Sequence, residues 1–309
     1  MDFRIEVRIV LLIVILSATF GCSSFSLSSR PTGILAPPEK YKDIIFLINN
    51  GGSAKARQFL NTTEIDGPYE AAWVNYFHGL LAMADKDFPK ALEIIETGHS
   101  RIYHKSSDKF QRLKGRFLKK LGWLQRWNKN YQGATFLHQK EYQVFKKYGS
   151  ALELHDALIS LDVDAYFLKR WDLSEKWLNE ALKVASDIDD KDNKLKSLAI
   201  THNNLSGTLS SLKKFEQAIQ NAILAHKYWT EFQVTKGQDQ SREVWATFNI
   251  GDIYFAWYQH LKVQEIAGAE TYQKKSIDAY KKSLSLARKR KIKKSDILYI
   301  KKQLSKVQK

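Results

Sequence analysis

The sequence predicts an all-α protein, an α-solenoid of about five antiparallel helix pairs with capping helices. Three observations lead to this prediction. After Pro89 the remaining 220 residues contain no proline, and they are rich in Leu, Ala, Lys, Glu and Gln, which favour helix. No alternation of apolar and polar residues competes with a helical assignment. Finally, small and aromatic residues recur at regular spacing, as they do in repeat architectures.

The repeat is marked first by a small or helix-packing residue in the first helix of each predicted pair. Five such residues occur at spacings of 43, 40, 44 and 45 positions: Gly79, Gly122, Asp162, Ser206 and Gly251. In the first four copies an aromatic residue follows nine positions later and a small residue twelve positions later: Phe88 and Ala91, Tyr131 and Ala134, Trp171 and Ser174, Phe215 and Ala218. Small residues let two helices approach closely, and the aromatic ring fills the space at their turn. Each copy therefore predicts one antiparallel helix pair.

This pattern resembles the tetratricopeptide repeat (TPR), and the resemblance covers about residues 70–290. The best copy runs from His202 to Ala225. The fifth copy carries 13 extra residues, because Ser276 follows Gly251 by 25 positions and not by twelve. The period exceeds the 34 residues of the family, which implies longer helices. The resemblance also implies a right-handed superhelix whose concave face binds partners.

The first 21 residues predict a signal peptide, because a short charged start precedes the apolar run Ile9–Leu16. The run is too short for the usual membrane-spanning helix. Gly21 and Cys22, the only cysteine, resemble the lipobox of bacterial lipoproteins. That resemblance implies cleavage before Cys22, acylation of this residue (palmitate is typical) and a lipid anchor in the bacterial cell envelope. Ser23 favours the outer membrane, facing the periplasm, over the inner membrane. The alternatives are an ordinary cleaved signal peptide and an uncleaved anchor.

The rest of the chain divides by composition. Residues 22–40 hold three of the five prolines and a serine cluster, and they predict a flexible tether. Residues 41–69 predict two short capping helices that break at Gly51 and Gly52. Residues 70–290 hold the repeats, and residues 291–309 predict a basic C-terminal capping helix.

The formal net charge is +16, and most of the surplus lies near the C-terminus. Between residues 274 and 309, fourteen basic residues stand against two acidic ones. One interpretation is that these lysines form the solvated outer face of the last helix. The other is a surface for anionic lipid, formed by Arg288, Lys289, Arg290, Lys291, Lys293 and Lys294. Because the chain is predicted to be exported, we expect no nucleic-acid partner.

No sequence motif predicts catalysis. A single cysteine excludes an intramolecular disulfide, an iron–sulfur cluster and a cysteine-based zinc site. None of the eight histidines forms a metal-binding motif, and the motifs of nucleotide sites and serine hydrolases are absent. We therefore expect no enzyme activity, no cofactor, no metal and no small-molecule substrate. The alternative, an enzyme built on a helical solenoid, would require a carboxylate pair in a cleft.

The TPR resemblance implies which side chains line the concave face. In the second repeat they are Arg116, Lys119, Trp123, Arg126 and Trp127, and the later repeats add Tyr166, Asn203 and Phe255. Cations and large rings together predict an aromatic groove with a basic centre, which suits an extended, acidic protein segment. We expect its energetic centre at Trp123 and Trp127. The alternative is that the rings belong to the core between repeats.

The predicted function is that of a non-catalytic adaptor or scaffold, a membrane-anchored periplasmic lipoprotein that binds extended protein segments. One alternative is a subunit of an outer-membrane protein assembly or pilus-biogenesis machine. Another is a cytoplasmic or inner-membrane TPR protein whose basic tail binds lipid or nucleic acid.

Overall fold

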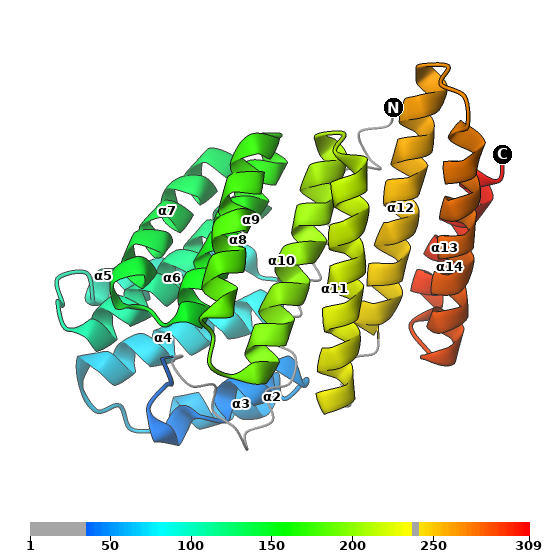
Figure 1. Cartoon of the computed structure of the whole chain (residues 1–309). Coiled ribbons are helices and arrows are strands. Elements are labelled where there is room, and N and C mark those ends of the chain that lie inside the picture. Colours follow the sequence, from blue (N-terminus) through cyan, green and yellow to red (C-terminus); the bar gives the residue numbers. More distant parts are fainter. Residues whose placement is uncertain (1–34, 237–240) are drawn as a thin grey trace. The chain divides into compact units, whose positions relative to one another are not determined.

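The computed structural model describes residues 35–236 and 241–309, in which thirteen α-helices and one short 3₁₀ helix follow one another without a strand (Figure 1). Helices pack mainly on their neighbours in the chain, so the predicted all-α solenoid is confirmed. The described residues divide into two compact units, with the boundary after Leu168. No helix in this part of the chain is long and apolar enough to cross a membrane. The predicted signal peptide and Cys22 lie outside the described residues.

The first unit contains the N-terminal helices and two complete helix pairs. Its elements are η1 (Glu39–Tyr41), α2 (Ile44–Asn49), α3 (Ser53–Thr62), α4 (Gly67–Ala84), α5 (Phe88–Arg101), α6 (Asp108–Trp127), α7 (Tyr131–Tyr148) and α8 (Ala151–Phe167). Helices α4 and α5 pack as one pair, α6 and α7 pack as the next, and α8 packs on α7. This order places the first helices of successive repeats, α6 and α8, within reach of each other.

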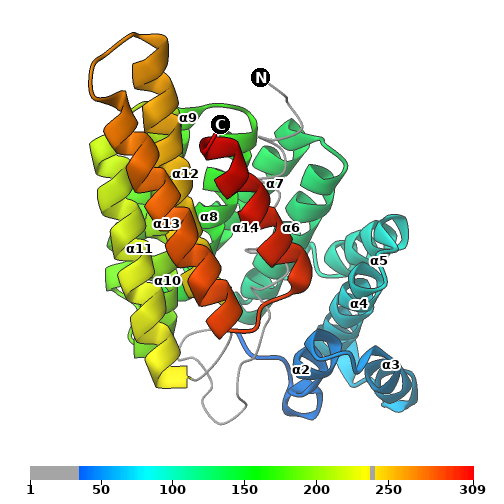
Figure 2. The same cartoon turned by 90° about the vertical axis from the view of Figure 1, so that its right-hand side faces the viewer.

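The second unit continues the same arrangement. Its elements are α9 (Trp171–Ser186), α10 (Lys191–Ser211), α11 (Phe215–Lys236), α12 (Ser241–Val263), α13 (Ala269–Lys289) and α14 (Lys294–Val307). Helices α10 and α11 form one pair and α12 and α13 form another, and α14 packs on α13 (Figure 2). Ile300 and Val307 of α14 are buried, so this last helix closes the apolar face of the final pair.

The small residues of the repeat lie against the second helix of their pair. A Cβ atom at Gly79 would overlap Ile95 of α5, and one at Gly122 would overlap His138 of α7. A Cβ atom at Gly251 in the fifth pair would crowd the ring of Tyr280 on α13, which would have to shift. The interpretation of these glycines as positions of close helix approach is therefore confirmed.

A lysine occupies the same turn position in the first four repeats, with φ of 64° at Lys86, 62° at Lys129, 57° at Lys169 and 61° at Lys213. A residue in this left-handed conformation ends a helix. In the first repeat, the N–H that follows Lys86 belongs to Asp87 and donates to the carbonyl of Ala82 over 2.9 Å. The repeat aromatic comes two residues after each lysine. This lysine is a further mark of the repeat, which the spacing of small residues and aromatics does not reveal.

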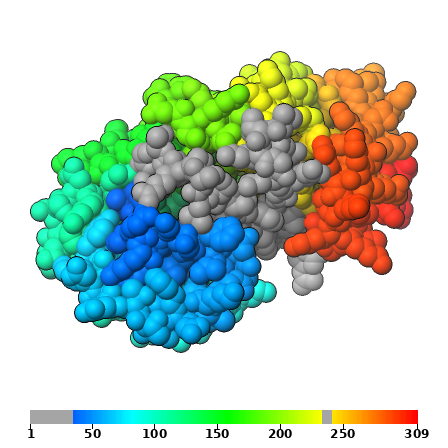
Figure 3. Space-filling view, turned by 90° about the horizontal axis from the view of Figure 1, so that it is seen from below, coloured from blue at the N-terminus to red at the C-terminus, as the bar shows by residue number. Residues whose placement is uncertain are grey.

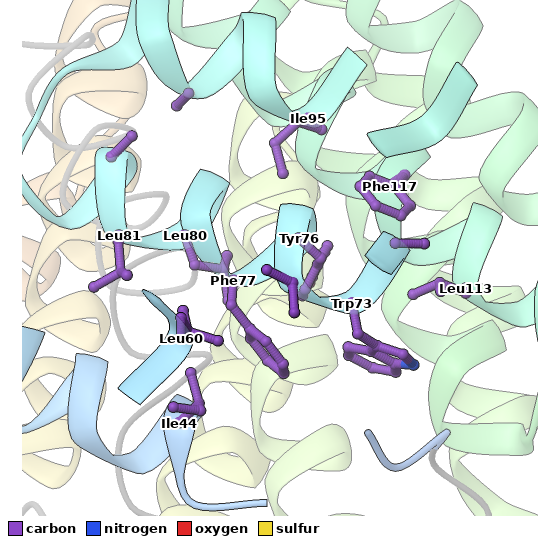
Figure 4. Close-up of a cluster of buried hydrophobic side chains, with 14 of the residues drawn as sticks. Ile44, Leu60, Trp73, Tyr76, Phe77, Leu80, Leu81, Ile95, Leu113 and Phe117 are labelled. Atoms are coloured by element: carbon purple, nitrogen blue, oxygen red, sulfur yellow. The ribbon is translucent and has the colours of Figure 1, made fainter. Parts of the chain in front are cut away.

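The core of the first unit gathers around α4. The rings of Trp73 and Phe77 stack with centroids 5.4 Å apart, and further apolar side chains surround them (Figure 4). Ile44 of α2 and Leu60 of α3 are buried in the same cluster. Figure 3 shows these N-terminal helices, in blue, lying beside the cyan helices that follow. Helices α2 and α3 thus cover an apolar face of α4.

The predicted tether, residues 22–40, needs a correction at its C-terminal end. Leu35 is half-buried and packs against the core cluster of the first unit. Tyr41, directly after the tether, is fully buried. Composition hid this contact, because a single leucine among prolines and serines gives no periodic signal. Residues 22–34 lie outside the described residues.

Candidate protein-binding face

Helices α6 and α8 of the first unit present stripes of opposite charge to each other. On α6, the residues three or four positions apart on one face are Arg112, Arg116, Lys119, Trp123 and Arg126. On α8, the same spacing gives Glu153, Asp156, Ser160 and Asp164. We call these nine residues the α6–α8 seam.

Ion pairs hold the seam along its length. The nitrogen–oxygen distances are 2.7 Å for Arg112 and Glu153, 2.7 Å for Lys119 and Asp156, and 2.8 Å for Arg126 and Asp164. Three carboxylates of α8 therefore pair with the four cations of α6, because Glu153 faces both Arg112 and Arg116, and this corrects the predicted open basic centre. The partners are 37 to 41 positions apart in the chain, so no local pattern on α6 reveals them.

Arg126 lies deepest in the seam. It is 9% exposed, and its partner Asp164 is fully buried. The other carboxylate oxygen of Asp164 lies 2.6 Å from Nδ1 of buried His138 on α7, so one carboxylate joins three helices. Burial lowers the pKa of His138, which leaves the imidazole neutral at pH 7 and able to donate to Asp164. Arg126 is therefore an internal cation that is not open to a partner, contrary to its predicted place in the groove.

Two carboxyl groups of neighbouring helices raise the pKa of Lys119, although only Asp156 forms an ion pair with it. Burial would lower the pKa of Lys119, but Asp156 and Glu141 of α7 outweigh this effect and raise it. Glu141 is fully buried, and within the described residues neither of its carboxylate oxygens has a hydrogen-bond partner. Burial raises the pKa of Glu141 to about 8. At neutral pH, Lys119 therefore pairs with Asp156 while Glu141 is mostly protonated.

The two tryptophans of α6 gather around Phe88, the turn aromatic of the preceding repeat. Ring centroids are 5.6 Å apart for Phe88 and Trp123 and 4.2 Å apart for Phe88 and Trp127. Trp123 is half-buried and packs with the core cluster, which agrees with the alternative that this ring belongs to the core between repeats. Trp127 is 51% exposed. Of the pair, Trp127 thus presents the larger open surface.

Arg116 contacts the segment before η1. Its Nη2 donates to the carbonyl oxygen of Leu35 over 2.7 Å and lies 3.8 Å from Oε1 of Glu153. The same Oε1 accepts the N–H of Leu35 over 3.0 Å. Glu153 was not among the predicted site residues. The signal that could have located it is its capping box with Ser150, which fixes the start of α8.

The remaining predicted groove residues are divided between the units. Tyr166 is half-buried on α8 of the first unit, where it packs with Val163. Asn203 and Phe255 belong to the second unit. Asn203 accepts a hydrogen bond from Asn249 over 3.2 Å, and the ring of Phe255 lies 6.1 Å from that of Tyr258. The structure therefore brings together only the second-repeat part of the predicted set.

The basic C-terminal residues also differ in their surroundings. Five of the six are exposed: Arg288, Lys289, Lys291, Lys293 and Lys294. Arg290 is half-buried, and its Nη2 lies 2.9 Å from a carboxylate oxygen of Glu243 on α12. Arg290 is therefore corrected from a free surface cation to a contact between α12 and the end of α13.

The described residues contain no group of three or more His, Cys, Asp or Glu placed to hold a metal ion. Among the residues of the seam, ion pairs and helix capping account for the carboxylates of Glu153, Asp156 and Asp164.

Comparison with known proteins bears on the fold. No protein-family model and no curated protein sequence matches the chain. Among solved structures, BtubC (BKLC) from P. vanneervenii aligns with a TM-score of 0.59 and 15% identity over 81% of this chain and 91% of its own. A signal-transduction ATPase with a tetratricopeptide repeat sensor, from Pyrococcus horikoshii, aligns with a TM-score of 0.62 and 14% identity over 97% of this chain and 46% of its own. NprR in complex with its cognate peptide NprX gives a TM-score of 0.51 and 14% identity over 84% and 69%.

At such low identity these likenesses show the fold alone. One of the three aligned structures contains a tetratricopeptide repeat sensor, and all three are likenesses of fold. The protein is thus an α-solenoid of TPR-like helix pairs.

Proposed function

We propose that the protein is a non-catalytic adaptor that binds extended protein segments on the α6–α8 seam and the rings beside it. The observation that carries this proposal is the exposed ring of Trp127, 4.2 Å from the ring of Phe88, beside charged groups that ion pairs hold in place. A tryptophan on a rigid support is typical of the anchors that dominate protein interfaces. The structure of NprR with its peptide supports a peptide ligand for this fold.

The ion pairs change the class of segment that we propose. Because the cations of the seam are paired, an acidic segment would have to displace Glu153 or Asp156 from its partner. Contacts with exposed charges contribute little, whereas aromatic contacts contribute about 0.5–1.5 kcal/mol beyond the area they bury. The ligand is therefore an extended segment with apolar or aromatic side chains, of balanced charge.

Selection from a random peptide library tests this function. Peptides enriched on the full-length protein should bind at least about 10-fold more weakly to the Trp127→Ala variant. Tyr103, which is 62% exposed on the same unit, supplies the matched control, and Tyr103→Ala should bind like the wild type. If no peptide is enriched, or if Trp127→Ala leaves binding unchanged, the adaptor function at this face is wrong.

We also propose that Cys22 carries a lipid anchor and that the protein resides at the outer membrane, facing the periplasm. Support comes from the N-terminal leader and its single cysteine. The five exposed cations between Arg288 and Lys294 support a second contact, with anionic lipid head groups.

A further inference from the structure

The first unit already binds one residue of its own chain through the main chain. Glu153 accepts the N–H of Leu35, and Arg116 donates to the carbonyl oxygen of the same residue. In an extended residue the N–H and C=O point to the same side, so two neighbouring side chains can contact both groups. The side chain of Leu35 packs on the core cluster.

The carboxylate of Glu153 is held in place by residues other than Leu35. Oε2 of Glu153 accepts two hydrogen bonds from Arg112, over 2.7 Å and 3.0 Å, and one from the N–H of Ser150 over 3.1 Å. Oε1 remains for the incoming N–H. Preorganised groups of this kind bind more tightly because little freedom is lost on binding.

The guanidinium of Arg116 is also fixed. Its Cζ lies 5.5 Å from the centre of the Trp73 ring, and the side chain is 17% exposed. Within the described residues, its buried Nε has no hydrogen-bond partner. Arg116 therefore contacts Leu35 through Nη2, while Trp73 and the surrounding side chains hold the rest of its side chain in place.

We infer that Arg116 and Glu153 form a main-chain clamp for extended segments with an aliphatic side chain, and that Leu35 occupies this clamp in competition with outside ligands. The inference rests on the proposed function and deepens it, since it names what the seam recognises and what controls access. Leu35 is six residues from buried Tyr41, so its effective concentration at the clamp is on the order of mM. An outside segment binds only when it outcompetes this arm or when the arm is withdrawn.

A peptide with the sequence of residues 33–40 tests the clamp directly. The Leu35→Asp substitution in the full-length protein should expel the arm, because it places a carboxylate beside Glu153 and an apolar cluster. The labelled peptide, followed by fluorescence anisotropy, should then bind at least 10-fold more tightly to Leu35→Asp than to the wild type. Leu298, an exposed leucine of α14, supplies the control, and Leu298→Asp should bind like the wild type.

One further variant of the protein and one of the peptide test the two sides of the clamp. Adding Arg116→Ala to the Leu35→Asp protein should abolish peptide binding, and a peptide that carries Leu35→Asp should not bind to either protein. Equal binding by the wild type and Leu35→Asp, or unchanged binding after Arg116→Ala, would overturn the clamp.

Hydrogen exchange of the wild type provides a measurement that needs no variant. The amide of Leu35 should exchange more slowly than that of exposed Ala36, and equal rates would overturn the clamp. The adaptor function is tested separately at Trp127. Library peptides that depend on Trp127 but bind equally to the wild type and Leu35→Asp would leave that function standing without the clamp. If the 33–40 peptide binds but the library selection enriches no peptide, the clamp serves only its own chain and the adaptor function is wrong.

Discussion

Glu141 offers the sharpest test of the electrostatics of the first unit. Its side chain is fully buried, and its carboxylate oxygens have no hydrogen-bond partner within the described residues. Burial raises its pKa to about 8, although Lys119 acts in the opposite direction. A carboxyl group in such a place is stable when protonated, since a buried charge without a hydrogen-bonded partner is strongly unfavourable.

The sign of the pH dependence follows from this shift. In the unfolded chain Glu141 titrates near its ordinary pKa of 4.5, and below that pH it is protonated in both states. Between pH 4.5 and about 8 the unfolded chain releases the proton while the folded chain keeps it, so the free energy of unfolding falls as pH rises. At about 1.4 kcal/mol per pKa unit, the loss is about 3 kcal/mol at pH 7 and up to about 5 kcal/mol above pH 8.

The substitution Glu141→Gln removes this titration and nearly conserves volume. We expect urea denaturation at intervals from pH 4.5 to 8.5 to show a flatter pH dependence for the variant, by about 3 kcal/mol or more. Glu96 is an exposed glutamate on α5, so Glu96→Gln is the matched control and should follow the wild type.

Two results would refute the reasoning. Parallel pH dependences for the wild type and Glu141→Gln would mean that the folded protein tolerates an ionised Glu141. Infrared spectroscopy of the wild type at pH 7 gives an independent test, because a buried protonated carboxyl has its own band. If that band is absent, Glu141 is ionised whether or not the variant folds.

Three further predictions concern the fold, the anchor and the basic surface. Ala218→Trp should destabilise the protein by about 1–3 kcal/mol or more, because Ala218 is fully buried, whereas Ile223→Trp on the exposed side of α11 should not; an unchanged melting temperature for Ala218→Trp would contradict the repeat register. Cys22→Ala should abolish labelling by a fatty-acid analogue in cells, and equal labelling of the wild type and the variant would end the lipoprotein proposal. Replacing Lys291, Lys293 and Lys294 with Gln should weaken binding to phosphatidylglycerol vesicles about 100-fold at low salt, at about 1 kcal/mol per cation, and binding that is insensitive to both the substitutions and salt would exclude an electrostatic lipid contact.

The helix pairs could be predicted from the sequence because close helix approach leaves a local mark. A small residue is required where Gly79 meets Ile95, and the chain must turn a fixed distance later. The fifth pair also has a small residue at the point of close approach, despite its 13 extra residues. Helices α12 and α13 are 23 and 21 residues long, and Gly251 still lies against Tyr280. The docking of Leu35 leaves no such mark, since it depends on two main-chain hydrogen bonds to side chains 81 and 118 positions away in the chain.

For the candidate site, the sequence could predict which residues share a face of α6, but not their burial or their partners. The TPR resemblance placed Arg126 on the same face as Lys119, and it could not show that Arg126 is buried against Asp164. The repeat pattern marks Asp162, whereas the ion pair with Arg126 is formed by Asp164, two positions later. Which aspartate meets which arginine depends on how α8 is rotated against α6, and only tertiary packing determines that rotation.

The seam connects the fold to the proposed binding site. A buried ion pair contributes little net stability, but the loss of one partner is strongly destabilising, and the pair of Arg126 and Asp164 joins α6 to α8. The clamp residues Arg116 and Glu153 lie on those same two helices. Nη2 of Arg116 and Oε1 of Glu153 lie 3.8 Å apart, and they contact the carbonyl oxygen and the N–H of Leu35. The charges that seemed to predict an acidic ligand therefore position side chains that recognise the peptide backbone itself.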